Sequence, residues 1–377
     1  MSSAEQFEVA VIGAGAMGSA AAWQLARRGH SVVLLEQFGP GHQQGSSHGA
    51  TRIYRVAYRE PSYVRLATES LRAWAELEQE SGQVLLEQSG QIDHGDPEAI
   101  EQVANNLEAA GFLAQRLSPT QAQEQWPGMR FDQAVVHSVD GGRVFADRTV
   151  QALHSCATAR GVTVAFHEPV QTIDSTSDGV ILQTPGRRVH ARLLVIAAGA
   201  WVEELLPGEF VLPKLTVSEQ VPVHFRKRNP SMRWPSFLHH MHANADALTF
   251  GAYGMESPLS GSAATGSAAS GSAAGKAAAS NAESFGLKVG VDNATDVGQV
   301  VAYVNKWHPG LHPDPVSSTQ CLFTSTADQQ FILQRQGPIV VCSTCSGHGF
   351  KFTPMIGELV ADMCEGLPAR YNFSSQI

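Results

Sequence analysis

The sequence predicts a mixed α/β fold in which a discontinuous, doubly wound domain is interrupted by a second domain built on a mixed antiparallel sheet. A strand–helix–strand pattern opens the chain, and two strands, a glycine turn and a helix close it. Between them, residues 216–257 alternate polar and apolar side chains. Buried parallel strands read as continuous apolar runs, whereas half-exposed antiparallel strands alternate. The ends of the chain and part of its middle are therefore expected to build one domain together.

The elements of the first domain follow in order along the chain. FEVAVI (7–12) and SVVLLEQF (31–38) are expected to form parallel strands around a helix whose small residues press against the sheet. RLLVIAAGAW (192–201) reads as a buried strand that enters a glycine turn, and PIVVCSTC leads to a helix near Pro354. Further helices are expected at 62–82, 98–112, 119–125 and 147–160, and strands at 162–167, 179–184 and 329–334.

Length and composition agree with a two-domain globular enzyme. The chain has 377 residues, of which 16% are charged and 43% hydrophobic, which excludes a wholly disordered or fibrous chain. A formal charge of −9 argues against nucleic acid as a partner, and no apolar run is long enough to cross a membrane. The start of the chain does not read as a signal peptide. The five cysteines do not suggest a disulfide framework, so a cytoplasmic location is expected.

One segment stands apart from both expected domains. Residues 260–282 contain nothing more apolar than alanine. Such a stretch cannot bury enough surface to offset its ordering entropy, so a flexible Gly/Ser/Ala linker-like insertion is expected there. Its composition suggests a designed linker, and a natural low-complexity insertion is the alternative.

A glycine fingerprint follows the first expected strand, because Gly13, Gly15 and Gly18 open the first helix. In this context glycines allow a tight turn, a close approach of backbone N–H groups to a pyrophosphate, and close helix–strand packing. Glu36 ends the second strand, where a carboxylate accepts from ribose hydroxyls and repels a 2′-phosphate. FAD or NAD is thus favoured over NADP, and a glycine turn without a ligand is the alternative.

Two further segments place basic residues near this turn. The stretch 43–58 carries His48, Arg52 and Arg55, which either face a bound anion or form a solvated cationic strand. Near the C-terminus, glycines before Lys351 allow a close approach to a cofactor, and the lysine either holds a carboxylate or is solvated. The pair Cys342 and Cys345 has no second pair, so packed thiols are expected there instead of a zinc site.

Four stretches together resemble the monomeric sarcosine oxidase and N-methyltryptophan oxidase family of FAD-dependent amine oxidases. They are VIGAGAMGSAAAWQLARRG, SSHGATRIYRVAY, QCLFTSTADQQFIL and CSGHGFKFTPMIGELVADM, and their order and spacing match over nearly the whole chain except 260–282. The resemblance implies a Rossmann-like, discontinuous FAD-binding domain and a substrate domain. We assign the former to 1–85, 146–215 and 320–377, and the latter to 86–145 and 216–319.

The resemblance also implies how FAD is held. Family members attach FAD through a cysteine thioether, and Cys321 stands at that position. His48 and Arg52 match residues that stabilise negative charge on the reduced flavin, and they could supply the positive charge that lowers the pKa of a reacting thiol. The fingerprint and the resemblance together give the cofactor-binding residues Gly13, Gly15, Met17, Gly18, Glu36, Ser47, His48, Thr51, Arg52, Gly199, Cys321, Gly347, Gly349, Phe350 and Lys351.

The substrate site follows from the same resemblance. Arg55 and Lys351 match residues that clamp the substrate carboxylate, and Lys288 matches the lysine that activates oxygen. Tyr253 matches an aromatic residue of the pocket. Phe323 stands where sarcosine oxidases have a tyrosine, and Asp292 where they have a histidine. The segment between Tyr253 and Lys288 is also longer than in relatives, so substrate access and rate could both differ.

The expected function is an FAD-dependent oxidase of a secondary amine amino acid, such as sarcosine or another N-methyl amino acid. Hydride transfer to the flavin, imine hydrolysis and reduction of O2 to H2O2 complete the reaction. One alternative is an oxidase of a cyclic or bulky amine such as pipecolate, proline or N-methyltryptophan. Another is a flavin-binding module without catalysis. The expected partners are a small amine and O2, with no nucleic acid, membrane or metal, and the chain is expected to be a monomer.

Overall fold

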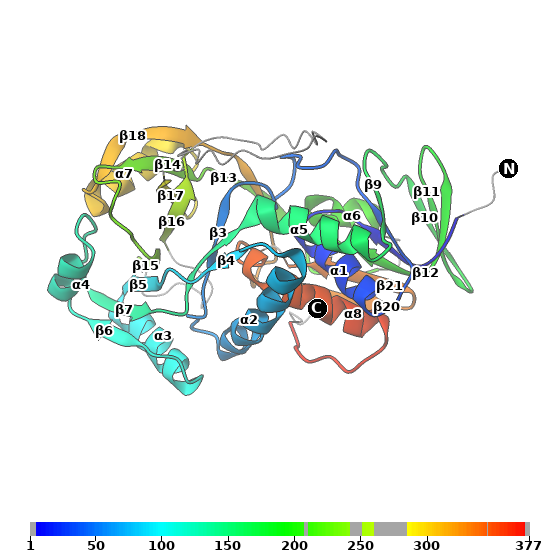
Figure 1. Ribbon diagram of the computed structural model, residues 1–377, viewed down its shortest axis with the longest axis horizontal. Helices are drawn as coiled ribbons and strands as arrows, with labels where there is room; N and C mark the ends of the chain where they lie inside the picture. The colour runs from blue at the N-terminus through cyan, green and yellow to red at the C-terminus, as the bar shows by residue number, and fades with distance from the viewer. Residues whose placement is uncertain (1–4, 207–209, 242–250, 260–284, 345, 374–377) are drawn as a thin grey trace, which may run out of the picture.

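The computed structural model describes residues 5–206, 210–241, 251–259, 285–344 and 346–373. The linker expected over 260–282 and the expected packed thiol of Cys345 lie outside the described residues. Two large sheets lie toward opposite ends of the longest axis of the molecule (Figure 1). Within the described residues, no helix has the length and apolar character needed to cross a membrane.

The first sheet confirms the predicted strand–helix–strand unit, because β1 pairs with β2 in parallel. β12 and β9 extend it in parallel on either side, β21 adds to β12 in parallel, and the outer strands β11, β10 and β20 are antiparallel. The predicted strand at 192–201 ends earlier, at Ile196, and a 3-10 turn η1 follows at Gly199–Trp201. The strands are β1 (Glu5–Ile12), β2 (Val32–Leu35), β9 (Thr163–Ala165), β10 (Thr172–Thr176), β11 (Gly179–Gln183), β12 (Arg188–Ile196), β20 (Ile332–Gln336) and β21 (Ile339–Ser343).

Four helices pack together beside this sheet: α1 (Ala16–Arg27), α2 (Pro61–Ser81), α5 (Ala146–Ala159) and α8 (Thr353–Cys364). α1 is rich in alanine, which lets α8 approach its backbone closely. A Cβ added at Gly357 of α8 would lie 2.5 Å from the Ala20 carbonyl oxygen. Arg28 joins the same pair of helices through an ion pair of 2.7 Å with Asp362. The first and last helices of the chain therefore form one packed unit.

The second sheet has eight strands in the order β18-β14-β17-β16-β15-β5-β7-β6. Its neighbours are antiparallel except for β15 and β5, which are parallel. β15 is buried along its whole length, so the expectation of half-exposed antiparallel strands over 216–257 is wrong for this strand. The strands are β5 (Gln91–Gly95), β6 (Gln115–Leu117), β7 (Ala134–Ser138), β14 (Val223–Lys227), β15 (Ser236–His240), β16 (Ala252–Pro258), β17 (Phe285–Val291) and β18 (Leu311–Ser318).

One face of the second sheet is covered by helix α7 (Val297–Trp307), which was not predicted. Its Val300 and Trp307 join Phe225 and Leu287 of the sheet in an apolar core. Because successive residues of a strand point to opposite faces, the neighbours of Phe225 and Leu287 face the other way, toward the first sheet. The remaining helices are α3 (Pro97–Ala109), α4 (Pro119–Gln125), α6 (Val202–Leu205) and the 3-10 turn η2 (Phe350–Phe352).

Two small ladders connect the expected domains. β3 (Thr51–Tyr54) pairs with β8 (Gly142–Phe145), which also pairs with β4 (Leu86–Glu87). β13 (Thr216–Gln220) pairs with β19 (Cys321–Ser325). Both ladders cross the expected domain boundaries, so the division stays a prediction.

Candidate functional site

A cavity of about 1330 Å³ extends from the glycine turn to Lys351. Its walls come from both large sheets and from the two small ladders between them. It brings together nearly all predicted site residues: Gly13, Gly15, Met17, Glu36, Ser47, His48, Arg52, Arg55, Gly199, Tyr253, Lys288, Cys321, Phe323, Gly347, Gly349, Phe350 and Lys351. Gly18 and Thr51 do not line it.

The turn between β1 and α1 is held by backbone contacts that only glycine permits. Gly13 has a φ of +98°, and a Cβ there would lie 2.5 Å from the Ala197 carbonyl oxygen. A Cβ on Gly18 would lie 1.9 Å from the Gly13 oxygen. α1 begins beyond Gly15 without a side-chain cap, so its first N–H groups face the cavity, with Ala16 donating to Ser47 Oγ at 3.0 Å. This end of a helix is suited to an anion such as a pyrophosphate.

Glu36 lies at the end of β2 with its carboxylate close to this turn. It accepts hydrogen bonds from the Ala14 N–H at 2.8 Å and the Phe38 N–H at 2.9 Å. Burial by itself would raise the pKa of Glu36, but interactions with His42 and these two N–H groups outweigh it and lower the pKa. The group is therefore an ionised acceptor, as binding of ribose hydroxyls requires.

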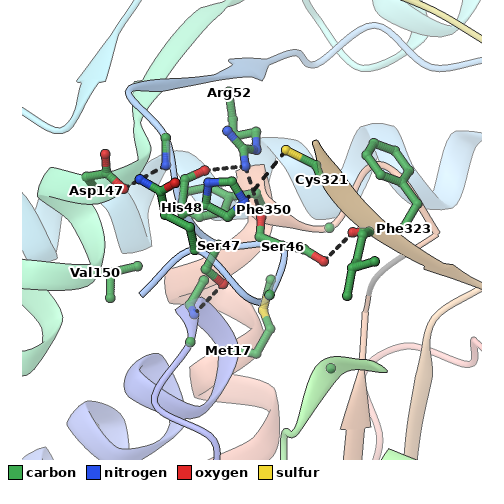
Figure 2. Close-up of a pocket in the computed structure, with 18 of the residues that line it drawn as sticks. Met17, Ser46, Ser47, His48, Arg52, Asp147, Val150, Cys321, Phe323 and Phe350 are labelled. Atoms are coloured by element: carbon green, nitrogen blue, oxygen red, sulfur yellow. Dashed lines mark hydrogen bonds between the residues drawn. The ribbon is translucent and has the colours of Figure 1, made fainter. Parts of the chain in front are cut away.

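Arg52 holds the loop of residues 46–51 by hydrogen bonds to its backbone carbonyls. Its guanidinium donates to the carbonyls of Ser46 at 2.9 Å, His48 at 2.6 Å and Thr51 at 2.9 Å. Figure 2 shows the bonds from Arg52 to Ser46 and His48, and the hydrogen bond of 2.5 Å from Ser46 Oγ to the Leu322 carbonyl. Because backbone carbonyls do not neutralise the guanidinium, its positive charge stays beside the cavity.

His48 lies against Cys321, with 3.8 Å between Nε2 and Sγ (Figure 2). Burial, followed by the charges of Arg52 and Lys288, lowers the pKa of His48 to about 4. His48 is therefore neutral at pH 7 in this structure and Arg52 carries the positive charge near the thiol, while the role that the resemblance gives His48 beside a bound flavin stays a prediction. A neutral His48 can accept the thiol proton, because one ring nitrogen is then an acceptor.

Lys288 projects from β17 and is only 5% exposed. Its Nζ donates to the Thr51 carbonyl at 3.4 Å. Burial, followed by repulsion from Arg52, lowers the pKa of Lys288 to about 7. The next strand places His224 directly beside Lys288, and both line the cavity.

Arg55 and Lys351 meet at one aromatic ring. The Arg55 guanidinium carbon lies 3.8 Å from the Tyr58 ring centroid, and Lys351 Nζ lies 5.7 Å from the same centroid. Both cations are buried, and Lys351 donates to the His348 carbonyl at 2.5 Å. Burial, followed by the charge of Arg55, lowers the pKa of Lys351 well below its ordinary value. An anion placed between the two cations would relieve this repulsion.

The wall beside these cations is aromatic and depends on glycines. A Cβ on Gly290 would lie 2.4 Å from the ring of Tyr253, so this ring lies across the glycine. Gly347 has a φ of +73°, and a Cβ on it would lie 3.0 Å from the ring of Phe323. A Cβ on Gly349 would lie 1.7 Å from the Thr344 oxygen. The glycines thus make the aromatic wall compact.

Polar atoms without a partner among the described residues point to a ligand in the cavity. They are Thr324 Oγ1, Thr344 Oγ1 and His348 Nδ1, which belong to cavity-lining residues. Buried polar atoms normally have hydrogen-bond partners, so a polar ligand that supplies them fits here. Together with the glycine cradle and Glu36, they fit FAD.

The titratable cavity residues that sequence reasoning missed include His42, Asp147, His154 and His224. His224 had a signal, because Val223 and Phe225 on either side of it are buried in the apolar core, which places His224 on the other face. Asp147 accepts from the Gly49 N–H at 2.7 Å across two segments distant in sequence. No local sequence pattern predicts a contact between residues so far apart in the chain.

Comparisons with known proteins show what the whole chain is similar to. A family model described as FAD dependent oxidoreductase matches residues 8–363. Peroxisomal sarcosine oxidase from Mus musculus is 30% identical over 98% of this chain and 94% of its own length. N-methyl-L-tryptophan oxidase from Yersinia pestis (strain Pestoides F) is 28% identical over 98% of both chains. The solved structure of NikD, an unusual amino acid oxidase essential for nikkomycin biosynthesis, is 25% identical with a TM-score of 0.80, covering 98% of this chain and 96% of that one.

Proposed function

The chain belongs to the FAD dependent oxidoreductase family, together with the sarcosine oxidases and N-methyl-L-tryptophan oxidases, and from this premise we propose its reaction. It is an oxidase of a secondary amine amino acid, either sarcosine or another N-methyl amino acid, and it releases H2O2. The observation that carries this proposal is the buried pair Arg55 and Lys351 on the Tyr58 ring, at the far end of the cavity from the glycine turn. A carboxylate is the ligand that two adjacent buried cations favour.

The residues at the other end would hold FAD. The N–H groups at the start of α1 face the pyrophosphate position, and Glu36 accepts from ribose. FAD held there would supply the acceptor for a hydride from the carbon next to the amine nitrogen and the two electrons for O2. Cys321 is the proposed point of covalent attachment, with His48 Nε2 at 3.8 Å as the acceptor of its proton.

The chain's own residues orient the substrate. Arg55 and Lys351 bind the carboxylate and thereby fix the position of the amine-bearing carbon. The binding energy of the carboxylate then offsets part of the activation barrier. Tyr253 and Phe323 form the wall that excludes water from this position. The substrate amine enters neutral, and its N–H proton leaves when the imine forms. Hydrolysis of the imine then gives an aldehyde and the demethylated amino acid.

Lys288 is the proposed oxygen-activating residue. Reduction of O2 develops negative charge, and a fixed ammonium near that charge lowers the barrier electrostatically. Lys288 suits this role because its Nζ is held in the cavity by the Thr51 carbonyl and has Arg52 nearby.

A cyclic or bulky secondary amine is the second candidate substrate. Phe323 and Asp292 both line the cavity, at positions where sarcosine oxidases carry a tyrosine and a histidine. The likeness to N-methyl-L-tryptophan oxidase, whose name gives a bulky secondary amine, supports the same alternative. A flavin-binding module without turnover is the third candidate, and release of peroxide with any amine would exclude it.

The reaction class is tested by mixing the protein anaerobically with a panel of N-methyl and cyclic amino acids while following the absorbance of oxidised flavin. Bleaching by sarcosine supports the first proposal, and bleaching only by a bulky or cyclic amine supports the second. Absence of bleaching with every member contradicts both. Covalent attachment is tested by acid precipitation, where yellow colour left in the supernatant would contradict the role of Cys321.

We also propose that the protein is a cytoplasmic monomer. No disulfide joins the described cysteines, which supports a reducing compartment. Size-exclusion chromatography with light scattering tests the monomer.

A further inference from the structure

One row of side chains crosses the eight-stranded sheet from its edge to the cavity. Ser317 on β18 pairs with His224 on β14, and His224 pairs with Lys288 on β17. Paired residues on neighbouring strands point to the same face, with Cβ atoms about 5 Å apart. All three side chains line the cavity, which confirms that this face is the inner one.

Burial increases in steps along this row. Ser317 is exposed, His224 is half-buried and Lys288 is buried. Ser317 Oγ and His224 Nδ1 lie 3.4 Å apart, so the imidazole contacts a hydroxyl that faces solvent. Strand pairing places Lys288 beside His224 on this face, and Lys288 Nζ donates to the Thr51 carbonyl at 3.4 Å. The polar side chain of His224 thus lies between solvent and the buried amino group of Lys288.

We propose that His224 connects Lys288 to solvent and returns the proton that Lys288 gives up when O2 is reduced. This inference rests on the proposed oxidase function. Reduction of O2 to H2O2 takes two electrons and two protons. The substrate hydride supplies both electrons and one hydrogen through the cofactor, and Lys288 gives the second proton. His224 then passes a solvent proton to Lys288, which balances the amine proton released with the imine.

The charges around His224 favour this role. Burial, followed by Lys288 on β17 and Arg52 on β3, lowers the pKa of His224 to about 4, so its imidazole is neutral at pH 7. A neutral imidazole donates from one nitrogen and accepts at the other, as a relay requires. The pKa of Lys288, about 7, allows it to lose and regain a proton near neutral pH. His224 acts through Lys288 in this proposal, so it is a positioning residue.

The test reduces the protein by light, without any amine, and then mixes it with oxygenated buffer in H2O and D2O. His224→Phe is expected to reoxidise about tenfold more slowly, with a larger solvent isotope effect and with recovery on adding imidazole. His224→Gln is expected to be intermediate, because it keeps a polar contact. His312→Phe on β18 is the matched control, since it removes an imidazole from the same strand edge outside the row.

A second readout needs no turnover. In oxidised protein labelled with 15N-lysine, the Lys288 signal is assigned with Lys288→Met, and the exchange of its Nζ protons with water is measured. His224→Phe is expected to slow this exchange several-fold. Unchanged exchange, or reoxidation equal to that of the unmodified protein, overturns the relay. If the unmodified protein reoxidises as slowly as Lys288→Met, the oxidase function of Lys288 fails instead, while the exchange measurement still decides the relay.

Discussion

The two ends of the cavity are built by different means. At the glycine end, one short turn between β1 and α1 forms the cradle with its own backbone atoms, and Glu36, Ser47 and Ala197 close around it. At the substrate end, side chains from β3, β16, β17 and η2 meet from segments far apart in the chain. The first end depends on the absence of side chains, and the second on their charge. Substitutions should therefore act by steric clash at one end and by electrostatics at the other.

The largest expected effect is steric. Gly18→Val places a side chain where even a Cβ would lie 1.9 Å from the Gly13 oxygen. Since the clash is with backbone, the turn must open, and we expect purified protein without flavin and with a lower melting temperature. Gly186→Ala is the control, because a Cβ there meets no described atom within 4 Å. Normal flavin content in Gly18→Val would contradict the statement that the glycine turn has no room for a side chain.

The second largest effect is expected on stability, at a buried ion pair within the second sheet. Lys227 Nζ lies 2.6 Å from Glu256 Oε1, and both side chains are buried. Lys227→Met leaves this carboxylate poorly compensated, and we expect about 3 kcal/mol loss of unfolding free energy in urea. Adding Glu256→Gln should recover part of the loss, and Lys214→Met at an exposed position should be neutral. Equal stability of Lys227→Met would show that the pair does not hold the sheet.

A smaller effect is expected where charge serves binding. Lys351→Met should lower kcat/KM for the amino acid by about 10- to 100-fold, the worth of one charge-assisted hydrogen bond. Flavin content is measured as well, because Lys351 is also among the expected cofactor-binding residues. The melting temperature should not fall, because a cation disfavoured by burial and by the charge of Arg55 has been removed. Steady-state kinetics and thermal unfolding on the same sample check both. A drop in stability with unchanged kinetics would assign Lys351 to the fold.

The smallest effect is a pH dependence. The pKa of Lys288 is lowered to about 7, so its ammonium predominates below pH 7, is half lost at that pH and disappears as pH rises further. Negative charge on a reduced cofactor would raise this pKa, so reoxidation by O2 should slow with rising pH at or above 7. Stopped-flow measurements across pH 6 to 10 give the reoxidation rate at each pH. Lys288→Met should reoxidise slowly, at a rate that does not change with pH. A rate that increases with pH would contradict an ammonium in this role.

The same contrast explains what could be predicted from the sequence. β1, α1 and β2 follow from apolar runs and glycines, and α4 begins at Pro119 and ends at Gln125, the predicted bounds. β5 was missed because its five residues, QIDHG, look like a polar loop although all are buried. Asp93 and His240 satisfy one another there, with Oδ1 and Nε2 2.8 Å apart. Polar strands of this kind become recognisable only after their partners are known.

The site divides in the same way. The glycines and Glu36 could be assigned a role from local pattern, whereas Arg55 and Lys351 needed a family resemblance before their meeting at Tyr58 was expected. The neutral state of His48 and the row that contains His224 depend on burial and on strand register, which no local pattern contains. Charge state and lateral pairing are properties of the folded chain.

The packing of α8 on α1 has a consequence for synthesis. Arg28 and Asp362, 334 residues apart, bond across this helix pair, and β21 extends the sheet beside β12. Because the ribosome makes α8 long after the glycine turn, we expect the N-terminal strand–helix–strand unit to complete its packing only once α8 has been made. Stable flavin binding is then expected to follow the synthesis of α8.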